Sequence, residues 1–373
     1  MNKFIRHATT TGWMFTIMIL LFSPTAAAWE KDGLRLRGRM MVRYQVDKDR
    51  LSDQWTDTLE LQRARFDGRW LVNDDLKLML EFEFGNGFEI RDVYAEYTVV
   101  QALKIKAGHF KKPFSRLRMS SRWDLVIPRR GLLNRQMNGL TGDFGGCGGR
   151  DIGLMFSGRV GESVKFRYFL GVFDGFSLVD TFYKDLDDPT EPNASHRDYV
   201  ARVQLRVVKG LVFAFHYNHK RASVIQATGG PMLDYTYNMF GADIRWKYHG
   251  FTLQVEGAYG DNPNAMKGHK LVGGHAIASY AINISDTVVL TPALMGELLD
   301  PDDVVDGQMA TRLAGALNLD IGQHIRIILS AEGGFDEYQW EVPEYITETD
   351  LRAELERARE VPTRIFLQIN VAI

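Results

Sequence analysis

The sequence predicts an all-β protein, a transmembrane antiparallel β-barrel of about sixteen strands, and three observations favour it. Apolar and polar residues alternate along many segments, and the connections between these segments are alternately short and long. No apolar run after residue 28 is long enough for a membrane helix. Alternation places the two kinds of side chain on opposite faces of a strand, so one face can contact lipid while the other lines the interior.

The N-terminus has the pattern of a cleavable secretory signal. Basic residues precede an apolar stretch over 13–22, which is followed by the alanines 26–28. A stretch of about ten residues is too short for a membrane-spanning helix, which needs roughly twenty. We therefore expect a signal peptide over 1–28 and a single outer-membrane barrel domain over 29–373.

The predicted strands show the alternation throughout the chain. In the first one, Leu34, Leu36 and Met40 share a face, and arginines occupy the other face. Several segments are about ten residues long, as a tilted membrane strand requires. The predicted strands lie near 34–46, 58–72, 76–84, 89–99, 103–110, 150–158, 163–173, 198–208, 211–219, 236–248, 251–260, 271–282, 287–295, 311–319, 324–332 and 362–373.

The connections predict which end of the barrel faces which side of the membrane. Brief turns such as Lys209-Gly210 and His249-Gly250 alternate with long polar segments, of which the third loop, about 111–149, is the longest. Short turns at the periplasm and long loops outside are typical of outer-membrane barrels. One connection departs from this order, because Gly85-Asn86-Gly87 is brief although it belongs on the loop side. It packs either inward or toward a partner subunit.

Basic residues follow the interior face of several predicted strands. Guanidinium groups stay charged and bind oxyanions with two hydrogen bonds, so rows of them suit an anion path. The other interpretation is salt bridges within the wall, because a simple register places Arg65 opposite Glu83 and Lys77 near Glu96. Both interpretations stay open for the lumen-wall candidates Arg35, Arg37, Arg39, Arg43, Arg63, Arg65, Arg69, Lys104 and Lys106.

The third loop carries the densest positive charge. Loops of this length in a compact protein are usually functional. We expect its cations to form a positively charged constriction that binds anions; a solvated loop, or a patch for the phosphates of lipopolysaccharide, is the alternative. Nucleic acid is the least favoured partner, because no nucleic-acid-binding motif is present. The constriction candidates are Lys111, Lys112, Arg116, Arg118, Arg122, Arg129 and Arg130.

The sequence gives no sign of catalysis. The nine histidines show no metal-ligand spacing, the one cysteine is Cys147, and no nucleophile and base stand in a recognisable arrangement. We therefore expect no enzyme activity, no cofactor and no metal. Aromatic residues near strand ends, namely Trp70, Tyr97, Trp246 and Tyr248, are candidates for the girdles at the membrane interfaces.

Three stretches resemble the phosphate-selective porin O and P family: "QRARFDGRW", "LKLMLEFEFGNGFEIRDVYAEY" and "KIKAGHFKKPFS", all between Gln62 and Ser115. Weaker similarity extends over most of the mature chain. The resemblance implies a trimeric sixteen-stranded outer-membrane channel with an in-folded third loop, whose best-known members conduct anions and bind phosphate. Arg63, Arg65 and Lys111 occupy matched positions. The chain departs from the common pattern of outer-membrane barrels by ending in Ile373 instead of an aromatic residue, which puts the efficiency of its assembly in question.

These observations together predict a diffusion porin in the bacterial outer membrane. We expect it to prefer anions, with phosphate or polyphosphate as candidate ions, and to contact outer-membrane lipids and lipopolysaccharide. A nonselective porin, and a surface-binding or adhesion barrel without an open pore, are the alternatives. Single-channel conductance separates the three.

Overall fold

The structure is a computed structural model that describes residues 30–48, 54–85, 87–137, 147–162, 164–175, 197–225, 232–262, 269–304, 309–334 and 363–372. Its strands are β1 (Glu30–Lys31), β2 (Leu34–Lys48), β3 (Trp55–Leu71), β4 (Leu76–Glu83), β5 (Glu89–Val100), β6 (Leu103–Lys111), β7 (Arg150–Val160), β8 (Lys165–Phe173), β9 (Asp198–Val208), β10 (Leu211–Ile225), β11 (Met232–Tyr248), β12 (Phe251–Asp261), β13 (Lys270–Tyr280), β14 (Ile282–Asn283), β15 (Val288–Asp300), β16 (Ala310–Ile321), β17 (Ile325–Gly334) and β18 (Thr363–Ala372). Its helices are α2 (Arg116–Met119), the 3₁₀ helix η1 (Arg122–Asp124) and α3 (Leu132–Met137).

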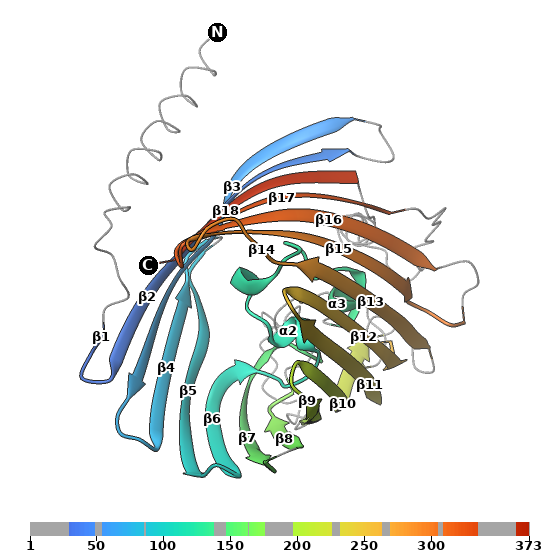
Figure 1. Cartoon of the computed structure of the whole chain (residues 1–373). Coiled ribbons are helices and arrows are strands. Elements are labelled where there is room, and N and C mark those ends of the chain that lie inside the picture. Colours follow the sequence, from blue (N-terminus) through green and yellow to red (C-terminus); the bar gives the residue numbers. More distant parts are fainter. Residues whose placement is uncertain are drawn as a thin grey trace.

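The strands form one closed antiparallel barrel (Figure 1). Each long strand pairs with the next along the chain, and β18 pairs with β2 from Thr363 opposite Lys48 to Ala372 opposite Arg39, which closes the ring. Within the described residues the ring holds sixteen long strands, and each overlaps one of the predicted segments. The structure therefore confirms the predicted barrel. The two-residue strands β1 and β14 pair with β2 and β15 as additions to it.

Alternation along the strands separates the two faces of the wall. On β16 the inward residues Ala314 and Ala316 are buried, whereas Leu313, which precedes them, and Leu317, which follows them, are 51% and 49% exposed. An apolar outer face is the surface that hydrocarbon requires. The predicted girdle residues Trp70, Tyr97, Trp246 and Tyr248 are all exposed, and each lies close to a short turn.

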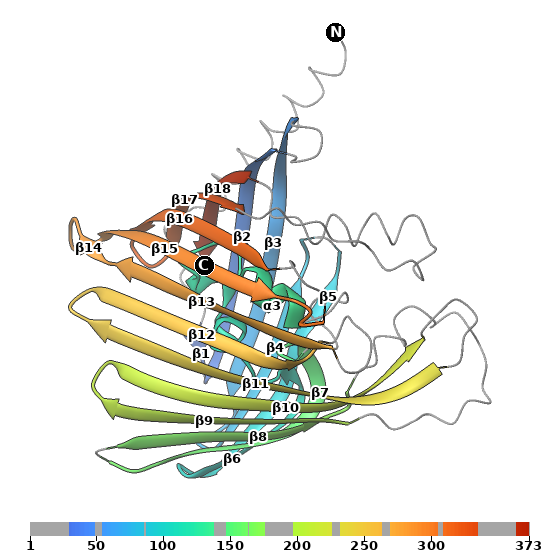
Figure 2. The same cartoon turned by 90° about the vertical axis from the view of Figure 1, so that its right-hand side faces the viewer.

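Short turns gather at one end of the barrel, where Figure 2 shows the connections from β9 to β10, from β11 to β12 and through β14. His249 and Gly250 form a two-residue turn with φ of 42° and 84°. Two successive positive φ values are the geometry that a tight hairpin needs to match the twist of its strands. At the turn after β3, the side-chain oxygen of Asn73 accepts hydrogen bonds from the backbone N–H of Asp75 at 2.9 Å and of Leu76 at 2.7 Å.

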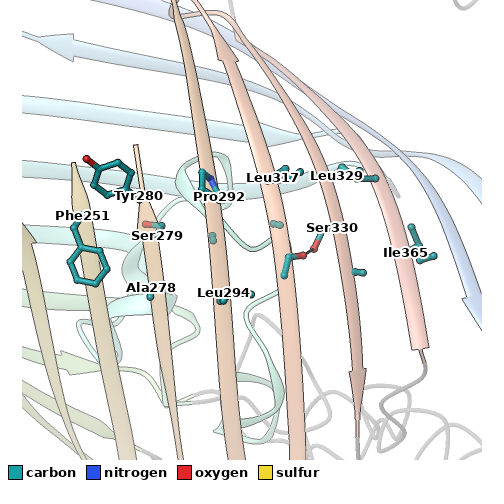
Figure 3. A pocket seen from close by; sticks show the side chains of 14 residues that line it. Phe251, Ala278, Ser279, Tyr280, Pro292, Leu294, Leu317, Leu329, Ser330 and Ile365 are labelled. Carbon is teal, nitrogen blue, oxygen red and sulfur yellow. Dashed lines mark hydrogen bonds between the residues drawn. The ribbon is translucent and has the colours of Figure 1, made fainter. Parts of the chain in front are cut away.

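The outer face carries an apolar hollow of about 680 Å³ between β12 and β18 (Figure 3). Its lining includes the exposed, outward side chains of Leu294, Leu317 and Leu329 and small residues such as Ala278 and Gly315. This hollow faces the lipid side of the wall and is separate from the interior. None of the helices in the described part of the chain is long and apolar enough to cross a membrane.

Candidate functional site in the barrel interior

The interior face of β2, β3 and β4 carries a network of paired charges. Arg39 contacts Asp67 at 2.8 Å and Glu81 at 3.1 Å, and Arg65 contacts Glu81 at 2.9 Å and Glu83 at 2.6 Å. These side chains are buried, so each charge depends on its partner for the stabilisation that water would otherwise give. Arg63 adds a contact to Glu83 at 2.7 Å.

The short turns fix this network as the sequence predicts. Arg65 is the cross-strand partner of Glu83, and Lys77 is the partner of Glu96, which it contacts at 2.6 Å. Lys106 reaches the same Glu96 from the other side at 3.0 Å. The wall salt bridges that the register predicts are therefore confirmed.

The remaining lumen-wall candidates differ in their partners. Arg37 contacts Asp67 at 3.1 Å, and Arg43 donates to the side-chain oxygen of Gln368 at 3.0 Å and 2.6 Å. Arg35 and Arg69 lie opposite each other near the turn end and are exposed. Lys104 lies opposite Ser157 on the neighbouring strand. The sequence therefore places these residues on the correct face but does not reveal which of them are neutralised.

The third loop forms compact structure of its own between β6 and β7. Ser115 begins it in an unusual conformation, with φ of 54° at a fully buried position, and its hydroxyl accepts from the backbone N–H of Arg118 at 3.2 Å. A non-glycine residue with positive φ is strained and persists only where its surroundings hold it. Ser121 caps η1 in a similar way, accepting from the backbone N–H of Trp123 at 3.4 Å.

Carboxylates on the facing wall hold this loop inside the ring of strands, where Figure 1 shows α2 and α3. Asp243 on β11 contacts Arg116 at 2.5 Å, and Glu256 on β12 accepts from the backbone N–H of Leu117 at 3.1 Å. Glu297 on β15 accepts from the first two backbone N–H groups of α3, those of Leu132 at 2.7 Å and Leu133 at 2.8 Å. A carboxylate is favourable at a helix start because those N–H groups have no partner within the helix.

The third loop also contacts strands from the first and last parts of the chain. Asn318 on β16 donates to the carbonyl of Val126 at 3.0 Å, and Arg326 on β17 donates to the carbonyl of Trp123 at 3.0 Å. The guanidinium of Arg39 on β2 lies 5.3 Å from the centre of the Trp123 ring. The described part of the loop thus contacts strands from β11 round to β2.

Apolar packing reinforces these polar anchors. One buried cluster joins loop residues such as Leu133 and Met137 to inward side chains of β6 to β9, β11 to β13, β15 and β16. A second joins Leu117, Leu125 and Ile127 to inward residues of β13, β15, β16 and β17, including Met295. Burial of this apolar area from water favours the folded position of the loop. The interior therefore contains a packed core as well as charged groups.

The predicted constriction cations have partners within the protein. Lys111 donates to the carbonyls of Arg118 at 3.0 Å and Ser120 at 3.2 Å, and Arg130 donates to the carbonyls of Leu117 and Ser120. Arg118 donates to the carbonyl of Gly148 at 3.1 Å, and Arg129 contacts Glu332 at 3.3 Å. Arg122 lies close enough to Arg63 for their charges to interact. Their predicted role as anion ligands stays a prediction.

Lys112 forms the most deeply buried of these pairs. Its ammonium contacts Asp198 on β9 at 2.5 Å and Asp151 on β7 at 3.7 Å, and neither Lys112 nor Asp198 is exposed. Burial alone would lower the pKa of Lys112, but the two aspartates raise it above its ordinary value. Lys112 is therefore charged and ties the start of the loop to the wall.

A group of cations that the sequence analysis does not select lies on the inner wall near the turn end. Arg159 on β7 is the cross-strand partner of Arg167 on β8, and Lys165 on β8 is the partner of Arg206 on β9. All four are exposed, and no ion pair to an acid is found for them among the described residues. Like charges directly opposite each other are destabilising, so this arrangement has a cost. We call these four residues the wall cation cluster.

Only the register reveals this cluster. The alternation places Lys165 and Arg167 on the interior face, but the pairing of β8 with two neighbours brings them beside Arg159 and Arg206. Glu96, whose charge also reaches Arg167, already contacts both Lys77 and Lys106. The cluster therefore keeps a net positive charge facing the interior.

Comparison with known proteins agrees with this geometry. Residues 34–161, which include β2 to β7 and the third loop, match the family model described as phosphate-selective porin O and P. This part of the chain, about a third of its length, is therefore similar to that porin family. No curated protein matches the sequence. The match and the barrel together make the chain a porin-type channel protein of the bacterial outer membrane.

Solved structures of other outer-membrane proteins share the fold at low sequence identity. An anion-selective porin from Comamonas acidovorans is 14% identical with a TM-score of 0.62, and the alignment covers 91% of this chain and 99% of that one. The trimer form of OmpT from Vibrio cholerae is 11% identical with a TM-score of 0.58, covering 91% and 99%. The channel DcaP of Acinetobacter baumannii is 13% identical with a TM-score of 0.56, covering 92% and 99%.

Proposed function

We propose that this porin is a trimeric diffusion channel that prefers small anions, and that it has no enzyme activity. The third loop forms the narrow part of the path, and the wall cation cluster supplies the positive field. Several weak sites along such a path let an anion enter and also leave. The family's description, the anion-selective porin with the same fold and the trimer form of OmpT support the proposal.

The wall cation cluster is the observation that carries the anion preference. The cations of β2 to β6 largely share salt bridges with acids, and several loop cations face Asp198, Asp243 or Glu332. Paired charges contribute little net field along the path. The four cluster residues are exposed and face the interior, where they attract an anion and repel a cation.

Reversal potentials in a planar bilayer test the preference. In a gradient of potassium chloride, whose ions have similar mobilities, we expect the sign that corresponds to chloride permeation. Replacing Lys165 and Arg206 by glutamine should move the reversal potential toward zero, because half of the cluster's charge is removed. A reversal potential near zero for the unaltered protein would contradict the proposal, and failure to conduct would favour an adhesion barrel.

A control with the same change in net charge separates the cluster from the protein's general charge. Lys31 on β1 and Lys209 in the turn after β9 are exposed but lie off the inner wall. The variant with glutamine at both positions should keep the reversal potential of the unaltered protein. An equal shift in both variants would mean that the cluster has no special position.

Phosphate is the proposed anion of highest affinity, because adjacent guanidinium groups suit its several oxygens. We expect added phosphate to block chloride current competitively, and to do so less in the variant that lacks Lys165 and Arg206. If phosphate leaves the chloride current unchanged, the channel has no phosphate site, although its anion preference can stand. Polyphosphate can be tested in the same assay.

A nonselective porin is the second candidate, and the salt-bridge network of β2 to β5 favours it. Arg65 with Glu83 and Lys77 with Glu96 neutralise each other across neighbouring strands. If the whole interior behaved in this way, potassium and chloride would permeate equally. The reversal-potential experiment therefore distinguishes the two candidates directly.

A further inference from the structure

Large and small outward side chains together form the apolar hollow on the outer wall. Ala278, Leu294, Gly315, Ala331 and Ile365 are cross-strand partners in turn, on the successive strands β13, β15, β16, β17 and β18. Leu294 is 70% exposed and stands beside small residues that leave room for a ligand. A Cβ atom added at Gly315 would meet only a methyl carbon of Leu294, at 3.5 Å, so a larger side chain fits there.

The strand pairing is interrupted at the edge of this hollow that lies nearer the short turns. β13 pairs with β15 only as far as Ser279 opposite Ala293, and β14 resumes the pairing in the same register. That register places Tyr280 opposite Pro292 in the interruption. Proline has no backbone N–H, so it cannot donate to the neighbouring strand. The pairing of β15 with β16 runs through Pro292 without a break, so the missing donor belongs to the β13 side.

The carbonyl of Tyr280 is the group that loses its donor. Successive residues of a strand direct their backbone N–H and C=O groups to alternate sides. Ala281 donates to the carbonyl of Gly250 at 3.0 Å on the β12 side, so Tyr280, one residue earlier, directs its carbonyl toward β15. There Pro292 offers no N–H. Hydrocarbon offers none either, so an uncovered carbonyl on this wall is costly.

This carbonyl lies at the level of the aromatic girdle near the short turns. Tyr280 is the cross-strand partner of Phe251, whose ring centre lies 5.9 Å from that of Trp246. Aromatic girdles mark the level of the lipid headgroups. Figure 3 shows Tyr280 and Pro292 together at one edge of the hollow, with Leu294 further along β15. An acceptor at headgroup level thus adjoins an apolar hollow that extends toward the middle of the bilayer.

We propose that this hollow binds one phospholipid with an ethanolamine headgroup, from the leaflet at the turn end. An acyl chain lies among Leu294, Leu317 and Leu329, and the ammonium group donates to the carbonyl of Tyr280. The volume of about 680 Å³ falls within the range of about 300–1,000 Å³ that is typical of ligand sites. A primary ammonium has three N–H donors, whereas the trimethylated ammonium of choline has none.

The preference must come from packing and from this hydrogen bond, because every lipid chain is equally apolar. Native mass spectrometry of the purified barrel, titrated with dioleoyl phosphatidylethanolamine or dioleoyl phosphatidylcholine, measures it. We expect one ethanolamine lipid to bind about tenfold more tightly than the choline lipid, the effect of one hydrogen bond from a charged donor. Equal binding of the two lipids would overturn the proposal and leave water as the donor to Tyr280.

Two leucine variants test the position of the site. Gly315→Leu fills the hollow and should abolish the tight binding. Gly296→Leu is the matched control, because Gly296 on β15 also lies on the outward face, and a Cβ atom there would likewise meet only a leucine methyl carbon at 3.5 Å, that of Leu313. Gly296 does not line the hollow, so this variant should bind the ethanolamine lipid as the unaltered protein does. Equal behaviour of the two variants would overturn the assignment.

A third variant tests the headgroup contact. Pro292→Ala restores a backbone N–H opposite Tyr280, so the two lipids should bind almost equally to it, whereas an unchanged preference would contradict the role of this carbonyl. The variant decides this point even if Gly315→Leu fails to fold. If Gly315→Leu instead lowers the fraction of oligomer and leaves lipid binding intact, the hollow is a contact between copies of the chain and the lipid proposal is wrong. None of these outcomes depends on the ion preference of the pore.

Discussion

Lys112 shows how a single buried charge can be explained by structure. Its ammonium lies between Asp198 and Asp151, and Cys147 is buried beside it. Replacing Lys112 by glutamine would remove the ammonium that contacts the buried Asp198 at 2.5 Å, and loss of one partner of a buried ion pair costs about 3–5 kcal/mol in comparable pairs. We expect a clear fall in the denaturant midpoint of the reconstituted barrel.

Lys270 provides the control for this substitution. It pairs with Asp261 near the rim, and its side chain is 34% exposed. Water and salt screen such a pair, so Lys270→Gln should change the free energy of unfolding by less than about 1 kcal/mol. Equal effects of the two substitutions would show that the Lys112 pair has no special role in stability.

The same pair predicts a dependence on pH. Because the pKa of Lys112 is raised in the folded protein, its contribution to stability is complete at neutral pH. That contribution should be lost as the pH rises through and above the ordinary lysine value of about 10.4. The denaturant midpoint of the unaltered protein should therefore fall more between pH 9 and pH 11 than that of Lys112→Gln. Parallel pH curves for the two proteins would contradict this.

Cys147 offers a native reporter for the third loop. Burial, followed by the charge of Asp198, raises the pKa of its thiol to about 12. The folded protein should therefore react very slowly with a maleimide at pH 7.5, and the unfolded chain should react completely, as measured by mass spectrometry. Rapid labelling of the folded barrel would show that this part of the loop leaves the interior.

At the scale of elements, the second half of the third loop depends on one carboxylate. Glu297 accepts from two N–H groups of α3 and also contacts Arg312 at 3.3 Å. Gly131 precedes the helix with φ of 92°, and any side chain there would collide with the Glu297 carboxylate. The helix start and the wall thus fit each other closely.

Removing this anchor should loosen the loop. Glu297→Ala leaves two buried N–H groups without their acceptor, and hydrogen bonds to a charged group are worth about 1.5–3 kcal/mol each. We expect faster maleimide labelling of Cys147 and noisier single-channel current. Glu60→Ala is the control, because the Glu60 side chain is 42% exposed and its one ion pair, to Arg43 at 4.0 Å, is long and therefore weak. If both variants label alike, Glu297 does not position the loop.

The strands were predictable because their signals are local. Alternation identifies each strand, and a short turn fixes the register of the hairpin that it joins, as for Arg65 with Glu83. The structure extends β10 and β11 beyond the predicted segments, to Ile225 and back to Met232. In these extensions apolar and polar residues no longer alternate cleanly, so the alternation does not show where the two strands end.

The loop anchors were not predictable for the opposite reason. Asp198, Asp243 and Glu297 lie far from the third loop in sequence, and the alternation shows only that they face inward. The position of a loop in the interior depends on many such contacts and on apolar packing at once. The wall cation cluster lies between these cases, because its residues were on the predicted face but their proximity required the register of three strands.

At the scale of the whole molecule, the formal net charge of −2 hides a strong separation of charge. The outer wall is apolar, the interior of β2 to β6 is largely neutralised, and the wall cation cluster remains exposed near the turn end. A field from exposed charges acts through water, so it is screened over about 10 Å in 0.1 M salt and about 3 Å in 1 M salt.

This screening predicts how selectivity changes with salt. If the exposed cluster sets the anion preference, the ratio of chloride to potassium permeability should fall markedly when the mean concentration rises from 0.1 M to 1 M at a fixed gradient ratio. Reversal potentials measured at both concentrations give the ratio directly, and the variant without Lys165 and Arg206 should depend less on salt. A preference that persists in 1 M salt would instead require direct contact between the anion and closely spaced donors, because contacts within a few ångströms escape screening. In that case the cations of the third loop, and not the wall cation cluster, would be the ones to replace.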